Sequence, residues 1–371
     1  MSLPSRAPPP PRYLRRIRVL IIDDSLTMRR LIRMALQVDP RIEIVGEARD
    51  GRHARDQITA LRPDVLTMDV EMPGESGLSL LEWVMRDAPR PVVMVSAVTQ
   101  AGSAAAVEAL SLGAVECVPK PSADQRQPDL VPILRAVLAA SLARVARRDR
   151  PMEARRVPVG AKGFIWNGKY VVMGASTGGV DALEKVLAAL PANCPPIVIT
   201  QHMPAAFTAS FVQRLNARLP FRVALASSGA PLLPGQVLVA PGGDSHLSIA
   251  TPAKPVCLLT DGPPRNGHRP SVDVLFSSAA ALRDRAIGVL LTGMGRDGAE
   301  GMLAMRRNGA LCLAQDRRSS VVWGMPRVAY EMGAVDRLVP LSCMGTEILN
   351  GASRTARCVQ SGGAVERRAP P

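Results

Sequence analysis

Short apolar runs alternate with amphipathic stretches over the first 145 residues of the chain. The apolar runs lie at residues 19–22, 42–46, 65–68, 92–97 and 115–118, and between them apolar residues recur every three or four positions. Apolar runs of this length are typical of strands buried in a parallel sheet, and the intervening stretches are typical of helices that cover it. The pattern predicts a doubly wound (βα)5 domain over residues 18–140.

A second alternation of the same kind begins at residue 169. It predicts a second doubly wound α/β domain, with a mostly parallel sheet, over residues 166–350. Residues 141–165 are rich in Arg and Pro and predict a linker between the domains. The two ends, 1–17 and 351–371, predict disordered basic tails.

The net charge of +14 lies almost entirely outside the two predicted domains. Residues 1–18, 144–169 and 354–371 together account for the whole excess, so the remainder of the chain is neutral. Charge placed in this way is typical of solvated tails and linkers; the alternative is a weak contact with nucleic acid or lipid. Aromatic residues make up only 3% of the chain, which argues against a surface that stacks on bases. We therefore expect no nucleic-acid partner.

The sequence pattern also bears on membranes and on the cellular compartment. Apolar runs such as 287–291 are too short to cross a bilayer, and the first run ends at Asp23, which argues against a signal peptide. The six cysteines stand apart with no Cys-x-x-Cys pair, which favours reduced thiols over a disulfide framework or a zinc site. We expect a monomeric cytoplasmic protein without membrane insertion.

Polar side chains in the first domain occur where the predicted strands end. Asp23 and Asp24 follow the first apolar run, Asp69 the third and Lys120 the fifth, and Ser96 lies near the end of the fourth. In an open α/β sheet these ends meet at one edge. Three carboxylates suit Mg²⁺, the Lys and Ser side chains suit phosphoryl oxygens, and Asp69 can serve as a nucleophile. Each residue alone is more often a turn or cap residue, but their order favours a phosphorylation site.

Residues 18–140 resemble the receiver domain of two-component response regulators, through VLIIDDS, VLTMDVEMPGESGL, VVMVSA and VPKP. The resemblance implies phosphorylation of Asp69 by a histidine kinase, with Ser96 and Lys120 sensing the phosphoryl group. The carboxylates that would hold the required Mg²⁺ are Asp23, Asp24 and Asp69. One position departs from the receiver pattern, since Cys117 stands where an aromatic switch residue is usual, three residues before the lysine.

Three strand-end loops of the second domain carry the residue types of a serine hydrolase. After the run at 170–173, GASTGG places Ser176 in a Gly-x-Ser-x-Gly turn before a predicted helix. The glycines allow a sharp turn there, and the helix N–H groups can face an oxyanion. His202 follows the next apolar run and can act as a base, and Asp297 follows the run at 286–292 and can orient that base. The pattern favours a Ser–His–Asp triad.

Other uses of these residues stay open at this point. A Gly-rich loop between a strand and a helix more often binds a phosphate or a dinucleotide, although GASTGG lacks the P-loop lysine. His246 and His268 are rival bases, or loop residues with no chemical role. The competing functions are a nucleotide-binding domain and a response regulator with a DNA-binding output. The latter would need a helix-turn-helix and a basic folded face, and neither is visible.

The segments GASTGG, ITQHMP, DGPPRNGHRPSVDVLF and LLTGMGRDGAEGMLAM are similar to the catalytic domain of the chemotaxis protein-glutamate methylesterases, the CheB family. A receiver in front of this domain is the architecture of that family, and the two resemblances together cover about residues 18–350. The roles implied are nucleophile, base and orienting acid for Ser176, His202 and Asp297, flanks of the oxyanion site for Thr177 and Met294, and substrate contacts for Arg265, His268 and Arg269.

The resemblance implies hydrolysis of glutamate methyl esters on methyl-accepting chemotaxis receptors, with release of methanol, and deamidation of particular glutamines. This hydrolysis would need no cofactor, whereas Mg²⁺ would serve the receiver. The implied partners are the receptors as substrate and a chemotaxis histidine kinase as phosphodonor. The resemblance also implies that the unphosphorylated receiver covers the catalytic loops and that phosphorylation opens them.

Overall fold

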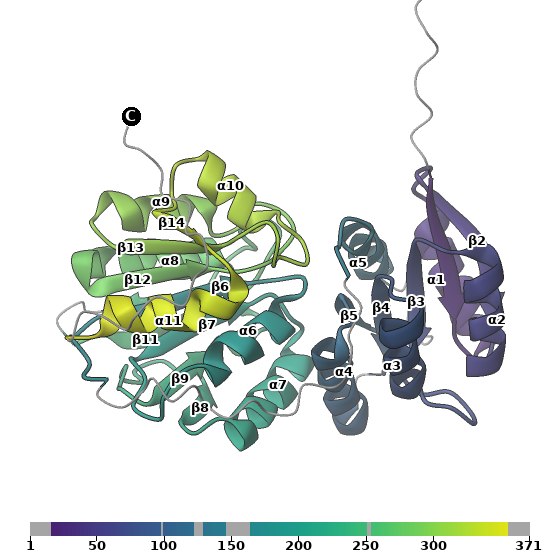
Figure 1. Cartoon of the computed structure of the whole chain (residues 1–371), viewed down its shortest axis with the longest axis horizontal. Helices are drawn as coiled ribbons and strands as arrows, with labels where there is room; N and C mark the ends of the chain where they lie inside the picture. Colours follow the sequence, from purple (N-terminus) through teal and green to yellow (C-terminus); the bar gives the residue numbers. More distant parts are fainter. Residues whose placement is uncertain (1–15, 98, 122–128, 146–163, 251–253, 355–371) are drawn as a thin grey trace, which may run out of the picture.

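The computed structural model describes residues 16–354 except 98, 122–128, 146–163 and 251–253 (Figure 1). Most of the predicted linker and tails therefore lie outside the described residues. Helix α11 (Leu341–Ala352) continues past the predicted domain boundary at residue 350. Ala352 is buried, and its carbonyl accepts a hydrogen bond from the Asn167 amide. Residues 351–354 thus belong to the fold and not to the predicted tail.

The first domain is a five-stranded parallel sheet with strand order β2-β1-β3-β4-β5, which confirms the predicted (βα)5 fold. Strands β3 and β4 are wholly buried, as expected for a parallel sheet covered on both faces. Four of its helices begin at a residue whose side chain accepts a backbone N–H of the first turn, the usual N-cap. The elements are β1 (Ile17–Ile22), α1 (Leu26–Gln37), β2 (Ile42–Ala48), α2 (Gly51–Leu61), β3 (Val65–Asp69), α3 (Gly77–Asp87), β4 (Val92–Ser96), α4 (Gln100–Leu112), β5 (Glu116–Pro119) and α5 (Val131–Ser141).

The second domain is built on a seven-stranded parallel sheet with strand order β14-β13-β12-β6-β7-β9-β8, which confirms the predicted α/β class. Its elements are β6 (Tyr170–Ala175), α6 (Gly179–Ala188), β7 (Ile197–Gln201), α7 (Ala205–Arg218), β8 (Arg222–Leu225), β9 (Gln236–Val239), β10 (Ser245–Ala250), β11 (Val256–Asp261), α8 (Val272–Ala279), the 3-10 helix η2 (Ala280–Arg285), β12 (Ala286–Leu290), α9 (Ala299–Arg307), β13 (Leu311–Gln315), α10 (Met325–Glu331), β14 (Arg337–Val339) and α11.

Strand order in the second sheet reverses between β6 and β12. The chain proceeds outward from β6 through β7 on one side and from β12 through β13 on the other. In open α/β sheets a ligand site lies outside the carboxyl ends of the strands at such a switch point. The loops that follow β6, β7 and β12 carry the predicted triad. The antiparallel ribbon β10–β11, which the sequence pattern did not predict, lies apart from this sheet.

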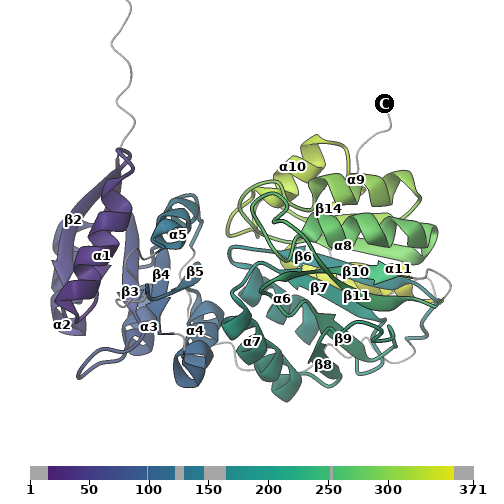
Figure 2. The same ribbon diagram turned by 180° about the vertical axis from the view of Figure 1, so that it is seen from behind.

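The two domains pack against each other through α4 of the first domain and α6 and α7 of the second domain (Figures 1 and 2). Leu110 on α4 and Phe207 on α7 belong to one buried apolar cluster. Around it, the Ser111 hydroxyl donates to Glu184 Oε1 at 2.9 Å, and Arg214 Nε donates to the same oxygen at 2.8 Å. The contact therefore combines apolar packing with a small polar network.

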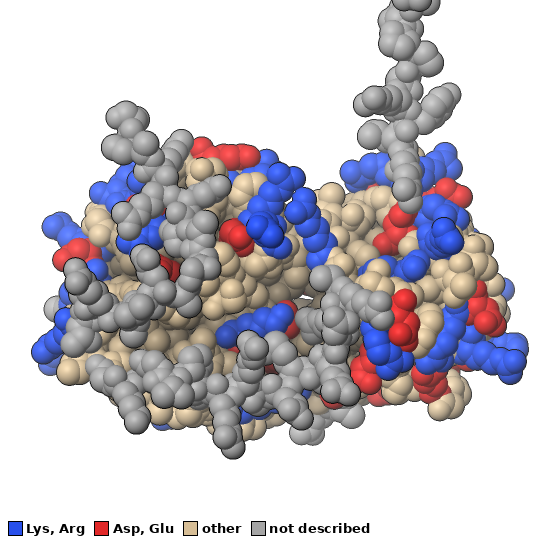
Figure 3. All heavy atoms as spheres, in the orientation of Figure 1, with Lys and Arg blue, Asp and Glu red and all other residues tan. Residues whose placement is uncertain are grey.

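Charged side chains of both signs are interspersed over the visible face of the first domain (Figure 3). Glu47, for example, accepts from Arg29 at 3.1 Å and from Arg33 at 2.6 Å. This agrees with a folded part that is close to neutral. Among the residues that the structure describes, no helix has both the length and the apolar character to cross a bilayer.

Candidate functional site

The predicted acidic pocket of the receiver forms at the carboxyl edge of its sheet. Asp23 and Asp69 are buried and Asp24 is exposed, and their carboxylate oxygens lie within 4.8 Å of one another. Lys120 Nζ lies 2.6 Å from Asp69 Oδ2 and 3.6 Å from Asp23 Oδ2. Parallel strands end at one edge, so residues 51 positions apart in the sequence meet there.

These carboxylates fit a hard divalent cation. Burial raises the pKa of Asp23 to about 6, and the neighbouring Asp69 carboxylate adds to the shift against the opposing charge of Lys120. Asp23 Oδ2 is buried and has no hydrogen-bond partner among the described residues. This oxygen has lone pairs free for an ion, and two more carboxylates lie beside it. Together they form a set of oxygen ligands of the kind that Mg²⁺ prefers.

Ser96 links this pocket to the helix that contacts the second domain. Its hydroxyl donates to the Gly102 carbonyl in the first turn of α4 at 3.1 Å. The hydroxyl would have to leave that carbonyl to meet a phosphoryl oxygen on Asp69, which would release a constraint on α4. Cys117, in place of the usual aromatic residue, is buried on β5, and burial raises the pKa of its thiol.

The loop after β6 presents Ser176 at the start of α6. Gly178 has φ +74°, a conformation that side chains rarely adopt, and a Cβ on it would lie 2.7 Å from Val321. A Cβ on Gly179 would lie 2.2 Å from Gln201 Oε1. Gly178 is therefore needed for the tight turn and Gly179 for the close approach of Gln201. Ser176 is only 7% exposed.

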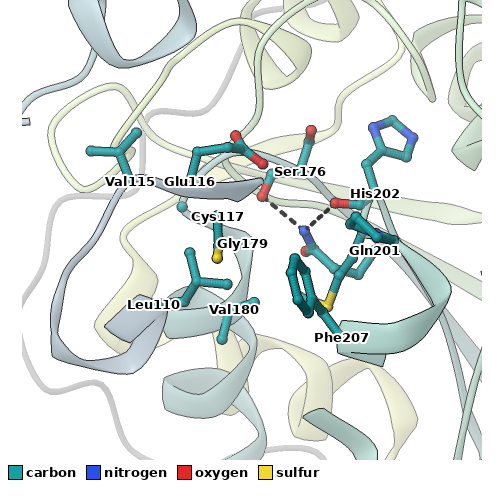
Figure 4. Close-up of a pocket in the computed structure, with 13 residues that line it drawn as sticks. Leu110, Val115, Glu116, Cys117, Ser176, Gly179, Val180, Gln201, His202 and Phe207 are labelled. Carbon is teal, nitrogen blue, oxygen red and sulfur yellow. Dashed lines mark hydrogen bonds between the residues drawn. The ribbon is translucent and has the colours of Figure 1, made fainter. Parts of the chain in front are cut away.

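His202 and Asp297 come together from the loops after β7 and β12. His202 Nε2 lies 2.8 Å from Asp297 Oδ2, and both side chains are buried. His202 Nδ1 is also buried and has no hydrogen-bond partner among the described residues, Ser176 included. The His–Asp pair is thus formed. The hydrogen bond between Ser176 and His202 is not made in this conformation, and Figure 4 draws none between these two side chains.

Asp297 is held by the N-terminus of α8 and by two side chains that the sequence reasoning missed. Its Oδ1 accepts from the Ser271 hydroxyl at 2.7 Å and from Asn266 Nδ2 at 3.0 Å, and its Oδ2 accepts from the Val272 amide at 2.6 Å. Burial alone would raise the pKa of this carboxyl, but the hydrogen bonds from His202, Asn266 and Ser271 outweigh burial and lower the pKa well below its usual range. Both missed residues lie in DGPPRNGHRPSVDVLF, so the signal was their place in that segment.

The two rival histidines differ in their surroundings. The ring of His268 stacks on His202 with centroids 3.7 Å apart and planes 7° apart. Burial and the neighbouring His202 lower the pKa of His268 to about 4. His246 accepts from the Ser271 amide at 3.2 Å, and its Nε2 lies 3.0 Å from the Pro263 carbonyl. Both ring nitrogens of His246 are therefore used in holding the loop.

The remaining predicted residues lie around the triad. Thr177 is buried beside Ser176, and Met294, 37% exposed, follows Gly293, which approaches the Ser176 side chain closely. Arg265 faces outward and pairs with Glu300 at 3.4 Å. Arg269 donates to the Gly262 carbonyl at 2.8 Å, which gives it a structural task in the loop.

The receiver covers this site. A narrow pocket between the domains is lined on the receiver side by Leu110, Val115, Glu116 and Cys117, and on the other side by residues that include Ser176 and His202 (Figure 4). A receiver packed on an α/β domain of this kind defines a response regulator whose output is an enzyme.

Comparison with known proteins names the particular family. Residues 171–348 match the model of the CheB methylesterase family, and residues 19–131 match that of the response regulator receiver domain. A relative from Caulobacter vibrioides, named protein-glutamate methylesterase/protein-glutamine glutaminase 1, is 53% identical over 91% of this chain and 98% of its own. A relative from Agrobacterium fabrum, named protein-glutamate methylesterase/protein-glutamine glutaminase, is 50% identical over 90% of this chain and 95% of its own. The chain belongs to this protein-glutamate methylesterase/protein-glutamine glutaminase family, which confirms both resemblances.

Solved structures of the separate domains are also similar. The CheB methylesterase catalytic domain of Thermotoga maritima is 37% identical, with a TM-score of 0.48, and covers 50% of this chain and 98% of its own. The response regulator domain of Thermotoga maritima CheB is 40% identical, with a TM-score of 0.32, and covers 34% of this chain and 97% of its own.

We predict that Ser176→Ala keeps the fold and lowers turnover of a glutamyl methyl ester by about a thousandfold or more, because members of a triad act as a unit. His202→Ala should lose about as much and Asp297→Asn somewhat less. Methanol release measures turnover, circular dichroism checks the fold, and Ser342→Ala, at an exposed serine, is the control. A tenth of normal turnover in Ser176→Ala would contradict a serine mechanism.

Asn266→Ala should lower kcat about fivefold, with KM little changed, because loss of one hydrogen bond to Asp297 loosens the carboxylate that orients His202. Steady-state kinetics on a soluble glutamyl methyl ester measure both constants. Asn308→Ala, which removes an exposed amide bonded to the Ala304 carbonyl, is the matched control. Equal kcat in Asn266→Ala and the control would show that this amide does not position Asp297.

Proposed function

We propose that this protein hydrolyses methyl esters of glutamate side chains on methyl-accepting chemotaxis receptors and deamidates particular receptor glutamines. The observation that supports this most is the meeting of Ser176, His202 and Asp297 at neighbouring strand ends, within a chain of this family. Relatives at 53% and 50% identity bear both activities in their names. The reaction releases methanol from the ester or ammonia from the amide and serves receptor adaptation.

The proposed mechanism starts from the buried His202–Asp297 pair. Asp297 accepts the hydrogen on His202 Nε2, which leaves Nδ1 as the base. Ser176 turns toward Nδ1, loses its proton to it, and attacks the γ-carbonyl carbon. Backbone N–H groups at the start of α6 face the oxyanion, with Thr177 and Met294 on either side. The protonated His202 then donates to the leaving methanol, and water hydrolyses the glutamyl ester of Ser176.

Control would come from the receiver. Asp23, Asp24 and Asp69 would hold Mg²⁺, which supplies the charge that allows a phosphoryl group to transfer to Asp69. A chemotaxis histidine kinase is the phosphodonor. Lys120 and Ser96 move toward the phosphoryl group. Because the Ser96 hydroxyl is bonded to Gly102 in α4, and α4 packs on α6 and α7, this movement reaches the contact between the domains. Phosphorylation thereby shifts an equilibrium between covered and uncovered catalytic loops.

The remaining expectations concern the setting of the reaction. The five cysteines that the structure describes are free thiols, which fits the reducing cytoplasm. We infer a monomer that binds receptors as substrates and the kinase as phosphodonor. Arg265, which lies 44% exposed beside the site, is available for contact with a protein substrate.

Methanol release from methylated receptor membranes tests the function as a whole. The purified full-length protein should release methanol from membranes that carry methylated receptors, and Ser176→Ala should not. Mass spectrometry of the receptors should show glutamate methyl esters converted to glutamate, and some glutamines converted as well. If receptors stay methylated while a generic soluble ester is hydrolysed, the enzyme is an esterase with another substrate.

Asp69→Ala should keep the basal rate of methanol release and lose its stimulation by a small phosphodonor or by beryllofluoride with Mg²⁺. The reason is that Asp69 alone among the pocket carboxylates carries the phosphoryl group. If about 1% of resting molecules are uncovered, stimulation of the normal protein cannot exceed roughly a hundredfold. Asp56→Ala, at a carboxylate on α2, is the control and should respond normally. Stimulation of Asp69→Ala equal to that of the normal protein would place the phosphorylation elsewhere.

Residues 166–353 alone should be faster than the unphosphorylated full-length protein on receptor membranes, because they lack the covering α4 and β5. Circular dichroism first confirms that the fragment is folded, and phosphorylated full-length protein provides the upper reference. A folded fragment no faster than the resting full-length chain would contradict a covering receiver, and would favour one that recruits the enzyme to its substrate.

A further inference from the structure

The receiver places a glutamate side chain on the nucleophile loop. Glu116 lies at the start of β5, and its Oε2 accepts a hydrogen bond from the Thr177 hydroxyl at 2.8 Å. The carbonyl of Val115 accepts from the Gly178 amide at 3.1 Å. Figure 4 shows Glu116 reaching from the receiver toward the loop that holds Ser176. Two adjacent receiver residues thus occupy polar groups of the loop that would receive a substrate.

The chemistry of these contacts matches that of the proposed reaction. The target of the enzyme is the γ-carbonyl group of a glutamate or glutamine side chain, and its product is a γ-carboxyl group. In the resting chain a γ-carboxyl group binds the Thr177 hydroxyl, and a carbonyl oxygen binds an N–H at the start of α6. The receiver therefore presents to the loop the same groups that a bound substrate or product would present.

The surroundings favour an uncharged γ-carboxyl group. Apart from Glu116, the titratable residues that line the pocket between the domains are Cys117 and His202, and no Lys or Arg is among its described lining residues. Burial raises the pKa of Glu116 to about 7 against the opposing hydrogen bond from Thr177. A protonated carboxyl has nearly the shape and the hydrogen-bonding carbonyl of a methyl ester or an amide. The pocket thus suits the neutral substrates better than it suits a carboxylate.

We propose that Glu116 is an internal ligand of the esterase site: its γ-carboxyl group occupies, in the resting chain, the place of the target γ-carbonyl group, and the Thr177 hydroxyl recognises both. This inference rests on the proposed function for the identity of the substrate. It goes beyond covering by the receiver, because a cover excludes a large protein whereas an internal ligand also competes with small molecules. Withdrawal of β5 would then empty the site and uncover it in one movement.

Labelling of Ser176 by a small fluorophosphonate tests local occupancy, since the serine oxygen displaces fluoride and no receptor is needed. We expect the unphosphorylated full-length Glu116→Ala protein to be labelled about two- to tenfold faster than the normal protein, the effect of losing one hydrogen bond on an equilibrium. Ser111→Ala is the matched control, because it removes a contact between the same domains to Glu184, away from the loop. Its labelling rate should stay close to normal.

The Glu116→Gln variant tests, through its pH dependence, whether the Thr177 hydroxyl recognises an uncharged γ-carbonyl group or only contacts the side chain. The glutamine keeps a γ-carbonyl oxygen for Thr177 and cannot ionise. In the normal protein the contact between Glu116 and Thr177 is at full strength below pH 4.5, the ordinary pKa of a glutamate. It weakens as the pH rises from there through about 7, the raised pKa of the bound carboxyl group. The ratio of normal to Glu116→Gln labelling rates should therefore rise severalfold from pH 5.5 to pH 8.5, while the pH dependence of Ser176 itself cancels.

Two results would overturn the proposal. One is a Glu116→Ala labelling rate equal to that of the normal protein, or a gain that Ser111→Ala reproduces. The other is a ratio of normal to Glu116→Gln rates that stays flat with pH. Failure of the proposed function looks different: methanol release from receptors would be absent in every variant, while the labelling differences at Ser176 would persist.

Discussion

Both sites of this chain depend on one constraint, namely that the carboxyl ends of parallel strands meet at a single edge of a sheet. Asp23 and Asp69 come from β1 and β3, and Ser176 and His202 from β6 and β7. In an antiparallel sheet the carboxyl ends of neighbouring strands lie at opposite edges, so residues that follow neighbouring strands would be kept apart. The same constraint explains why short, buried apolar runs lead directly into the reactive residues, because the strand supplies rigidity and the loop supplies the chemistry.

The acidic pocket of the first domain is connected to the nucleophile loop of the second domain through α4 and β5. Lys120 contacts the acidic pocket and Ser96 adjoins it. Glu116, at the start of β5, contacts the nucleophile loop. Only three residues separate Glu116 from Lys120 along the chain. A change in charge at Asp69 can therefore reach the catalytic loop along β5 itself, as well as through α4. Because β5 joins Glu116 directly to Lys120, this path would not need the aromatic residue whose place Cys117 takes.

The sequence predicted two kinds of feature: elements marked by a regular spacing of apolar residues, and polar residues that come directly after a strand. The two sheets, the acidic pocket and the His202–Asp297 pair all belong to that class. It did not predict the bonding of Asn266 and Ser271 to Asp297, because these residues lie in a loop without periodicity and 31 and 26 positions away. The ribbon β10–β11 was missed as well. It is a two-stranded unit apart from the main sheet, so no long buried run marks it.

Glu116 shows a further limit of sequence patterns. Within VECV it reads as a polar residue in a short strand, and only the packing of one domain on the other gives it a partner. That packing need not be strong to control the enzyme. A hundredfold shift between resting and open forms corresponds to about 2.7 kcal/mol, and one hydrogen bond contributes about 1 kcal/mol. The two hydrogen bonds at Val115 and Glu116 are thus of the same order as the energy that phosphorylation must supply. Loss of both hydrogen bonds, about 2 kcal/mol together, would account for most of such a shift, and the packing of α4 on α6 and α7 would account for the rest.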